Sequence, residues 1–142
     1  MDHIAFLKKS WKLKDKILVG EKTIESRWYM SKIAPWNKIH VGETIYFKDS
    51  GEPVTVRASV AKFLQFELTQ KKVLEILKQY GREITISDIQ KTYENNKDKK
   101  YCILIFLKDV KKIEPFYINK KGFGISCAWI TVDDVKRIKR QY

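Results

Sequence analysis

The sequence contains few of the residues that build metal centres and disulfides. It has two cysteines, Cys102 and Cys127, and two histidines, His3 and His40, among 142 residues. Neither pair has the spacing of zinc ligands, so we expect no metal site and no cofactor. Cys102 stands within an apolar run, where a thiol serves as a small hydrophobic side chain. Metal-dependent and disulfide-stapled classes of protein are therefore not indicated.

Long apolar runs and known catalytic signatures are also missing. No stretch approaches the length that crosses a membrane, and no apolar segment precedes a cleavage site near the first residue. The chain carries neither the Gly-x-Ser-x-Gly pattern of hydrolases nor a Walker phosphate loop. These absences predict a cytoplasmic protein that does not act at membranes.

Positive charge, by contrast, is abundant and unevenly spread. The formal net charge is +12, and residues 1–49 carry ten basic and six acidic side chains, residues 50–96 seven and six, and residues 97–142 twelve and five. Both ends of the chain are thus basic, whereas the middle is nearly neutral. Lysine and arginine placed against phosphates release counterions, so this distribution favours RNA or another nucleic acid as partner. An anionic membrane, an acidic small ligand, or solubility alone are the alternatives.

The pattern of apolar residues predicts a single α+β domain over residues 1–142. Runs of apolar and β-branched residues predict strands, and a last short strand ends at Trp129-Ile130. The longer runs cover residues 3–7, 23–29, 44–48, 54–66, 101–107 and 110–118.

Helices are expected at three places. Ser10 is a candidate cap for a helix through Val19, and Gly20 follows it in the position that favours a left-handed residue. Near residues 69–97 the period changes: Thr69 begins a helix that Gly81 ends, and the capping-box pattern of Ser87–Gln90 begins a second. A basic helix is expected between Thr131 and Arg140.

The densest polar cluster runs from Gly20 to Arg27, followed at once by Trp28 and Tyr29. Its Gly20-x-Lys22-x-x-Glu25-x-Arg27 pattern resembles the motif of the ASCH family, within the PUA-like superfamily. The resemblance implies a pseudo-barrel of about five to seven mostly antiparallel strands with peripheral helices, and the pair near 69–97 would be an insert. It also implies a positive cleft suited to RNA.

Strand geometry supports a site at this motif independently. Along a strand Thr23, Glu25 and Arg27 share one face, so Glu25 and Arg27 are neighbours that can pair. Lys22 would lie on the opposite face unless the turn at Gly20 breaks the alternation. A carboxylate beside an ammonium can bind a nucleobase N–H and a phosphate, or transfer a proton and stabilise an oxyanion.

Two further functions stay open beside RNA binding. Some ASCH proteins resemble ribonucleases, and others resemble amidohydrolases of modified nucleosides that use a threonine where this chain has Glu25. In either enzyme Lys22 and Glu25 would be the catalytic pair. A sensor of a nucleotide or other small anion is the third alternative.

Other candidates for ligand contacts lie after the motif or in loops. Exposed aromatic residues can stack a base, polar turns can line the cleft, and lysines beside glycines can touch phosphate. These candidates are Trp28, Tyr29, Lys48, Ser50, Lys120, Lys121, Ser126 and Trp129. Core packing is the alternative for the tryptophans, and a plain hairpin turn is the alternative for Lys48 and Ser50.

Overall fold

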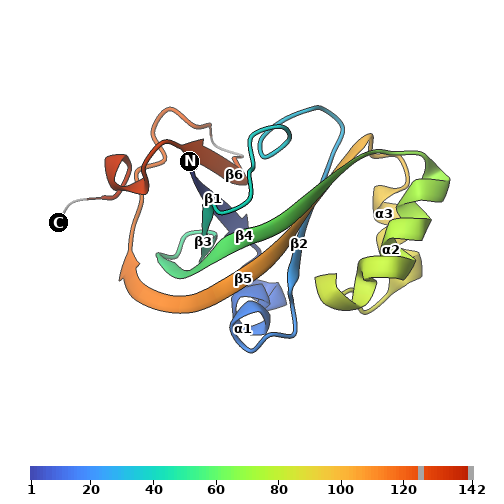
Figure 1. Ribbon diagram of the computed structural model, residues 1–142, viewed down its shortest axis with the longest axis horizontal. Helices are drawn as coiled ribbons and strands as arrows, with labels where there is room; N and C mark the ends of the chain where they lie inside the picture. Colours follow the sequence, from blue (N-terminus) through green and yellow to red (C-terminus); the bar gives the residue numbers. More distant parts are fainter. Residues whose placement is uncertain (125–126, 141–142) are drawn as a thin grey trace.

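A computed structural model describes residues 1–124 and 127–140. Six strands form one curled sheet, and two long strands run through its middle (Figure 1). The strands are β1 (Asp2–Leu7), β2 (Ile24–Tyr29), β3 (Thr44–Asp49), β4 (Val54–Glu67), β5 (Tyr101–Phe116) and β6 (Trp129–Val132). The helices are α1 (Leu13–Leu18), α2 (Gln70–Ile84) and α3 (Ile89–Asn96), with 3-10 turns at Lys9–Trp11 and Val135–Arg137.

The sheet has the order β2-β5-β4-β3-β1-β6, so β2 and β6 are its two edges. All neighbouring strands pair antiparallel except β1 and β3, which are parallel. Register shifts along β4 bend the long β4–β5 ribbon, because a bulge adds a residue to one strand and increases its twist. The curl brings the two edges towards each other, as expected for a PUA-like pseudo-barrel.

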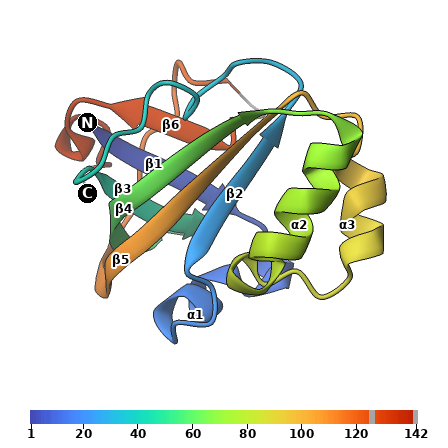
Figure 2. The same cartoon turned by 45° about the vertical axis from the view of Figure 1, so that its right-hand side comes forward.

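Three apolar clusters hold this arrangement together. The inner cluster fills the curl, and α1 covers one end of it through Ile17. The pair α2 and α3 lies side by side against the outer face near β2 (Figure 2), where Ile76 and Ile84 pack on Leu104. A third cluster forms where the chain after β5 folds over β1 and β3. Each face of the sheet is thus covered by a different part of the chain.

The helical insert begins where the sequence indicates. Thr69 is the N-cap of α2, since its side chain accepts a hydrogen bond from the backbone N–H of Lys72. The prediction that Gly81 ends α2 is wrong: the helix continues to Ile84, and Thr85 takes the left-handed conformation. Gly81 is a buried residue inside α2, and a Cβ placed on it would lie 3.9 Å from the Ile89 side chain, which is an ordinary packing distance.

Three other predicted boundaries are corrected. Ser10 does not cap a helix; it lies within the 3-10 turn, and α1 begins after Lys12, which has a φ of 54°. Asp88, not Ser87, caps α3 by accepting from Lys91 N–H. The runs 101–107 and 110–118, expected as separate strands, form one strand, β5, because a left-handed residue at Asp109 lets it continue.

The expected C-terminal helix is also absent from the described residues. The segment after β6 forms one 3-10 turn, and beyond it Ile118 and Lys139 make an isolated antiparallel bridge. No helix in residues 1–124 or 127–140 is long and apolar enough to cross a membrane.

Candidate functional site

Lys22 occupies the turn just before β2 and folds back over the strand. Gly20 has a φ of 81°, a conformation that glycine adopts without strain and that ends α1. The Lys22 ammonium donates hydrogen bonds to the carbonyls of Ile24 at 2.9 Å and Ile84 at 3.1 Å. Its Nζ lies 3.8 Å from Oε2 of Glu25. The turn therefore brings lysine and glutamate together although strand alternation alone would separate them.

Glu25 and Arg27 point into the curl, as the period of two predicts. Arg27 Nε approaches Glu25 Oε1 to 3.3 Å. The guanidinium also donates to the carbonyl oxygens of Ala128 at 3.3 Å and Phe6 at 3.2 Å. Phe6 belongs to β1 and Ala128 directly precedes β6. Arg27 thus bridges one edge of the sheet to the other and closes the barrel.

The charged atoms of the motif are buried rather than lining an open pocket. Lys22 is 3% and Glu25 4% exposed, and Glu25 Oε2 accepts no hydrogen bond within the described residues. Burial lowers the pKa of Lys22, and the charge of Glu25 opposes this shift. The Ile84 carbonyl is at the C-terminal end of α2, where unpaired carbonyls attract cations. The motif joins the helix pair, β2 and the β1–β6 edge through one charge cluster.

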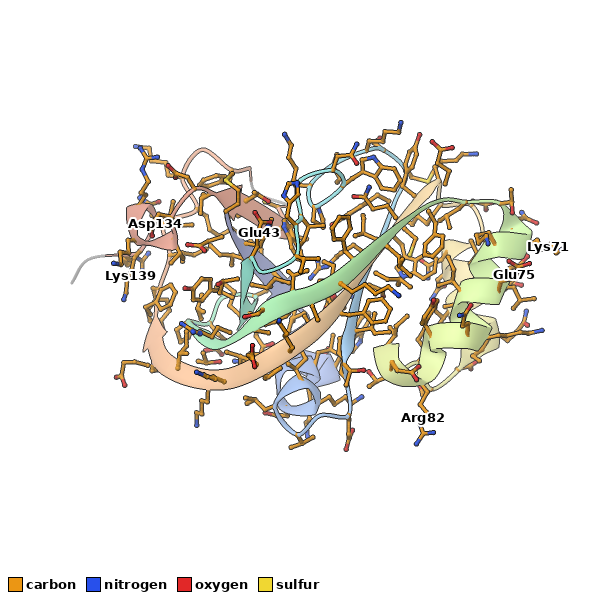
Figure 3. The ribbon with its side chains drawn as sticks, viewed as in Figure 1. Glu43, Lys71, Glu75, Arg82, Asp134 and Lys139 are labelled. Atoms are coloured by element: carbon orange, nitrogen blue, oxygen red, sulfur yellow. The ribbon has the colours of Figure 1, made fainter. Side chains whose placement is uncertain are left out.

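Trp129 and His3 extend this cluster inside the curl. The Arg27 guanidinium lies 5.1 Å from the centre of the Trp129 ring, and the indole N–H donates to His3 Nδ1 at 3.2 Å. The other ring nitrogen of His3 lies 2.8 Å from Glu43 Oε1, and Glu43 lies beside β1 (Figure 3). Because an indole only donates, His3 Nδ1 is an acceptor and its Nε2–H faces Glu43.

Sequence reasoning missed His3 as a support for the site. Burial lowers the pKa of His3, although Glu43 acts in the opposite direction, so the ring stays neutral. The only signal in the sequence was position: His3 alternates with Ala5 on the inner face of β1. Its partners come from residues 43, 129 and 131, and no local pattern predicts that contact.

Two lysines gather around the side chain of Phe6. Lys48 Nζ lies 4.8 Å and Lys120 Nζ 4.6 Å from the centre of its ring. Lys48 is only 5% exposed, and within the described residues its ammonium has no hydrogen-bond or ion-pair partner. Burial and then the charge of Lys120 lower the pKa of Lys48, while Asp49 opposes them. The Lys48 ammonium is therefore held beside a second positive charge without a carboxylate bound to it.

The glycine loop continues this positive region. Lys120, Lys121, Gly122 and Gly124 line an open hollow of about 430 Å³, and Gly122 has a φ of 92°. Lys121 is exposed, and its backbone N–H is taken by the Asn119 side chain.

The other predicted ligand contacts are dispersed. Ser50 is exposed, and its backbone N–H donates to Leu7 at the end of β1. Trp28 faces the opposite way from Glu25, towards the cluster beneath α2 and α3. Tyr29 packs on the inner core, where burial raises its pKa. Ser126 lies outside the described residues.

A larger hollow, of about 680 Å³, lies on the other side of the motif. Gly20 and Glu21 form one wall, and Gly81, Arg82 and Thr85 at the end of α2 form the other. It does not reach the lysines around Phe6. Across residues 1–124 and 127–140, no three His, Cys, Asp or Glu side chains are grouped so as to hold a metal ion.

The curled sheet, the parallel β1–β3 pair and the peripheral helices give the chain an α+β fold of the PUA-like pseudo-barrel type. More narrowly, the chain has the ASCH-domain fold. It superposes on ASCH from Zymomonas mobilis with a TM-score of 0.68 at 17% identity, covering 99% of this chain and 96% of that one. A single-substitution variant of that protein gives 0.70 at 17% identity, over 96% and 91% of the chains. A second variant gives 0.60 at 19% identity, over 82% and 75%.

Models of known protein families gave no match to this sequence, and neither did the curated protein sequences. The similarity is therefore one of fold, and it covers nearly the whole chain.

Proposed function

We propose that the protein is a nucleic-acid-binding module that holds RNA phosphates at the lysines around Phe6. The observation that carries this proposal is the state of Lys48, which is nearly buried, faces Lys120 and has no anionic partner within the described residues. Two like charges held near one ring repel each other unless an anion joins them. A phosphate supplies that anion, and the net charge of +12 supplies long-range attraction.

The Gly20–Arg27 motif contacts the lysine site through Phe6. Arg27 binds the Phe6 carbonyl, while the Phe6 ring contacts both lysines. Lys22 donates to two backbone carbonyls, so its ammonium is engaged in the fold. Burial of Lys22 and Glu25 favours a structural role over the alternative in which they cut RNA or hydrolyse a modified nucleoside. RNA is the nucleic acid that the ASCH-like motif implies.

The test uses the double variant Lys120→Gln/Lys121→Gln. It removes two positive charges from the loop, and neither of the replaced side chains is buried. The control is Lys71→Gln/Lys91→Gln, which makes the same charge change on exposed helical positions that have no ion pair. Binding of a fluorescein-labelled 20-nucleotide single-stranded RNA is measured by anisotropy from 50 to 300 mM KCl. Two lost phosphate contacts weaken binding on the order of 10–30-fold at 0.1 M salt.

Equal affinities of the two double variants would refute the lysine site. The same RNA is analysed for cleavage on a denaturing gel. Cleavage by the wild type that disappears in Lys22→Met but persists in Lys71→Met would establish the ribonuclease in place of the binding module.

A further inference from the structure

A second cluster of cations lies on the outer face of the β4–β5 ribbon, away from the Phe6 region. Arg57 stands directly opposite Lys111, and Ser59 opposite Lys108. Lys62 pairs with Phe106 and holds its ammonium 5.1 Å from the centre of that ring. We call Arg57, Lys62, Lys108 and Lys111 the outer-face band.

Strand alternation places the band on the solvent side of the sheet. Val56, Ala58 and Val60 point into the inner cluster, so Arg57 and Ser59 point outwards. The helix pair packs on this outer face between Leu64 and Phe66 of β4 and between Cys102 and Phe106 of β5. All four residues of the outer-face band are exposed. The band therefore occupies the stretch of β4–β5 that neither the helices nor the C-terminal segment covers.

The charges of the band have no carboxylate partner among the described residues, whereas four other cations of the chain each have one. Lys9, Lys72, Lys97 and Arg137 each pair with a carboxylate within 3.2 Å. In the described part of the chain, no side chain of the outer-face band has an ion pair or a hydrogen bond. Like charges directly opposite each other on a sheet reduce stability, and Arg57 and Lys111 are such a pair. A polyanion lying across the ribbon would remove that repulsion.

We infer that the outer-face band is a second contact surface for the sugar-phosphate backbone of the bound nucleic acid. It is on the same face as Tyr46, which pairs with Arg57 and is followed two residues later by Lys48. A single nucleic-acid strand can thus extend from the lysines around Phe6, past Tyr46, to the outer-face band. The contacts are cationic and offer no groove for base edges, so they bind the backbone without reading sequence. This inference rests on the proposed function for its choice of polyanion.

The decisive variant is Arg57→Gln/Lys111→Gln, compared with the helical control Lys71→Gln/Lys91→Gln. Lys71 lies on α2, at the far end of the molecule from the C-terminal turn (Figure 3). For the 20-nucleotide RNA, loss of two phosphate contacts lowers the slope of log K against log[salt] by about 1.4 and weakens binding on the order of 10–30-fold at 0.1 M. A trinucleotide, too short to reach both surfaces, should bind both variants as it binds the wild type.

The outcomes separate this inference from the proposed function. Equal 20-nucleotide affinities for the band variant and the helical control overturn the inference, even if Lys120→Gln/Lys121→Gln binds weakly. Loss of binding in the band variant but not in the loop variant supports the band and overturns the Phe6 site. Failure of the wild type to bind RNA overturns both. Poly-glutamate or anionic vesicles that compete as well as RNA at equal charge would overturn the assignment to nucleic acid.

Discussion

Replacing Lys22 by methionine tests whether the motif lysine belongs to the fold. Methionine keeps most of the apolar stem and removes the ammonium, so the carbonyls of Ile24 and Ile84 lose a donor each. Hydrogen bonds from a charged group contribute about 1.5–3 kcal/mol apiece. The cost of burying the charge, which lowers the pKa of Lys22, offsets part of that gain. We expect a net loss of about 1–3 kcal/mol in the free energy of unfolding, scaled from those two principles.

The assay is urea denaturation followed by circular dichroism, with Lys71→Met as the control. Lys71 is exposed and unpaired, so its replacement should change stability by no more than about 0.5 kcal/mol. In a thermal melt, the Lys22 variant should unfold roughly 3–10 °C below the wild type, given the usual relation for a chain of this size. Equal stability of the two variants would refute a structural role for Lys22.

The pH dependence of the free energy of unfolding provides a second test of Lys22→Met. Because the folded-state pKa of Lys22 lies below its ordinary value of 10.5, the unfolded chain binds more protons between these two values. The free energy of unfolding therefore rises with pH in that window. The stability difference between wild type and Lys22→Met should grow as the pH approaches 10.5. A difference that shrinks would mean that the contacts of Lys22 raise its pKa instead.

Two shorter predictions concern the neighbouring groups. Arg27→Lys should destabilise the fold by about 2–4 kcal/mol in urea, because lysine lacks the planar fork whose two terminal nitrogens reach the separate carbonyls of Ala128 and Phe6. An unchanged midpoint would show that the edges of the sheet hold together without this residue. His3→Gln can keep the bond from Trp129 and the bond to Glu43. Because the pKa of His3 is lowered from 6.5, the wild type should lose stability as the pH falls below that value, by about 1.4 kcal/mol per unit at most. The variant should lose less between pH 7 and 5, and parallel curves would contradict a buried neutral His3.

The sequence was sufficient for those features that depend on local periodicity. Strand alternation predicted that Glu25 and Arg27 share one face, and Arg27 Nε lies 3.3 Å from Glu25 Oε1. It did not predict that β5 is continuous, because Lys108-Asp109 interrupts the apolar run, and a left-handed residue at Asp109 carries the strand past that point.

Contacts distant in sequence were beyond prediction. The burial of Lys22 depends on Ile84, 62 residues away, at a helix end that the sequence placed at Gly81. The outer-face band likewise depends on the pairing of β4 with β5 across the helical insert, which places Arg57 opposite Lys111. The periodicity of apolar residues indicates which side chains face inwards, but it does not indicate which strands pair with each other.

The separation of buried and exposed cations has a consequence for access to Glu25. In the described part of the chain, β2 and β6 are edges of the sheet, and Arg27 joins them through side-chain hydrogen bonds instead of a strand ladder. A side-chain bridge opens at lower cost than a ladder, because only the bonds of one residue break. Glu25 Oε2 is buried without a hydrogen-bond donor in the described residues, and the other oxygen of this carboxylate lies 3.3 Å from Arg27 Nε. Entry to Glu25 from the side of Phe6 and Ala128 therefore begins with the release of Arg27 from these two carbonyls.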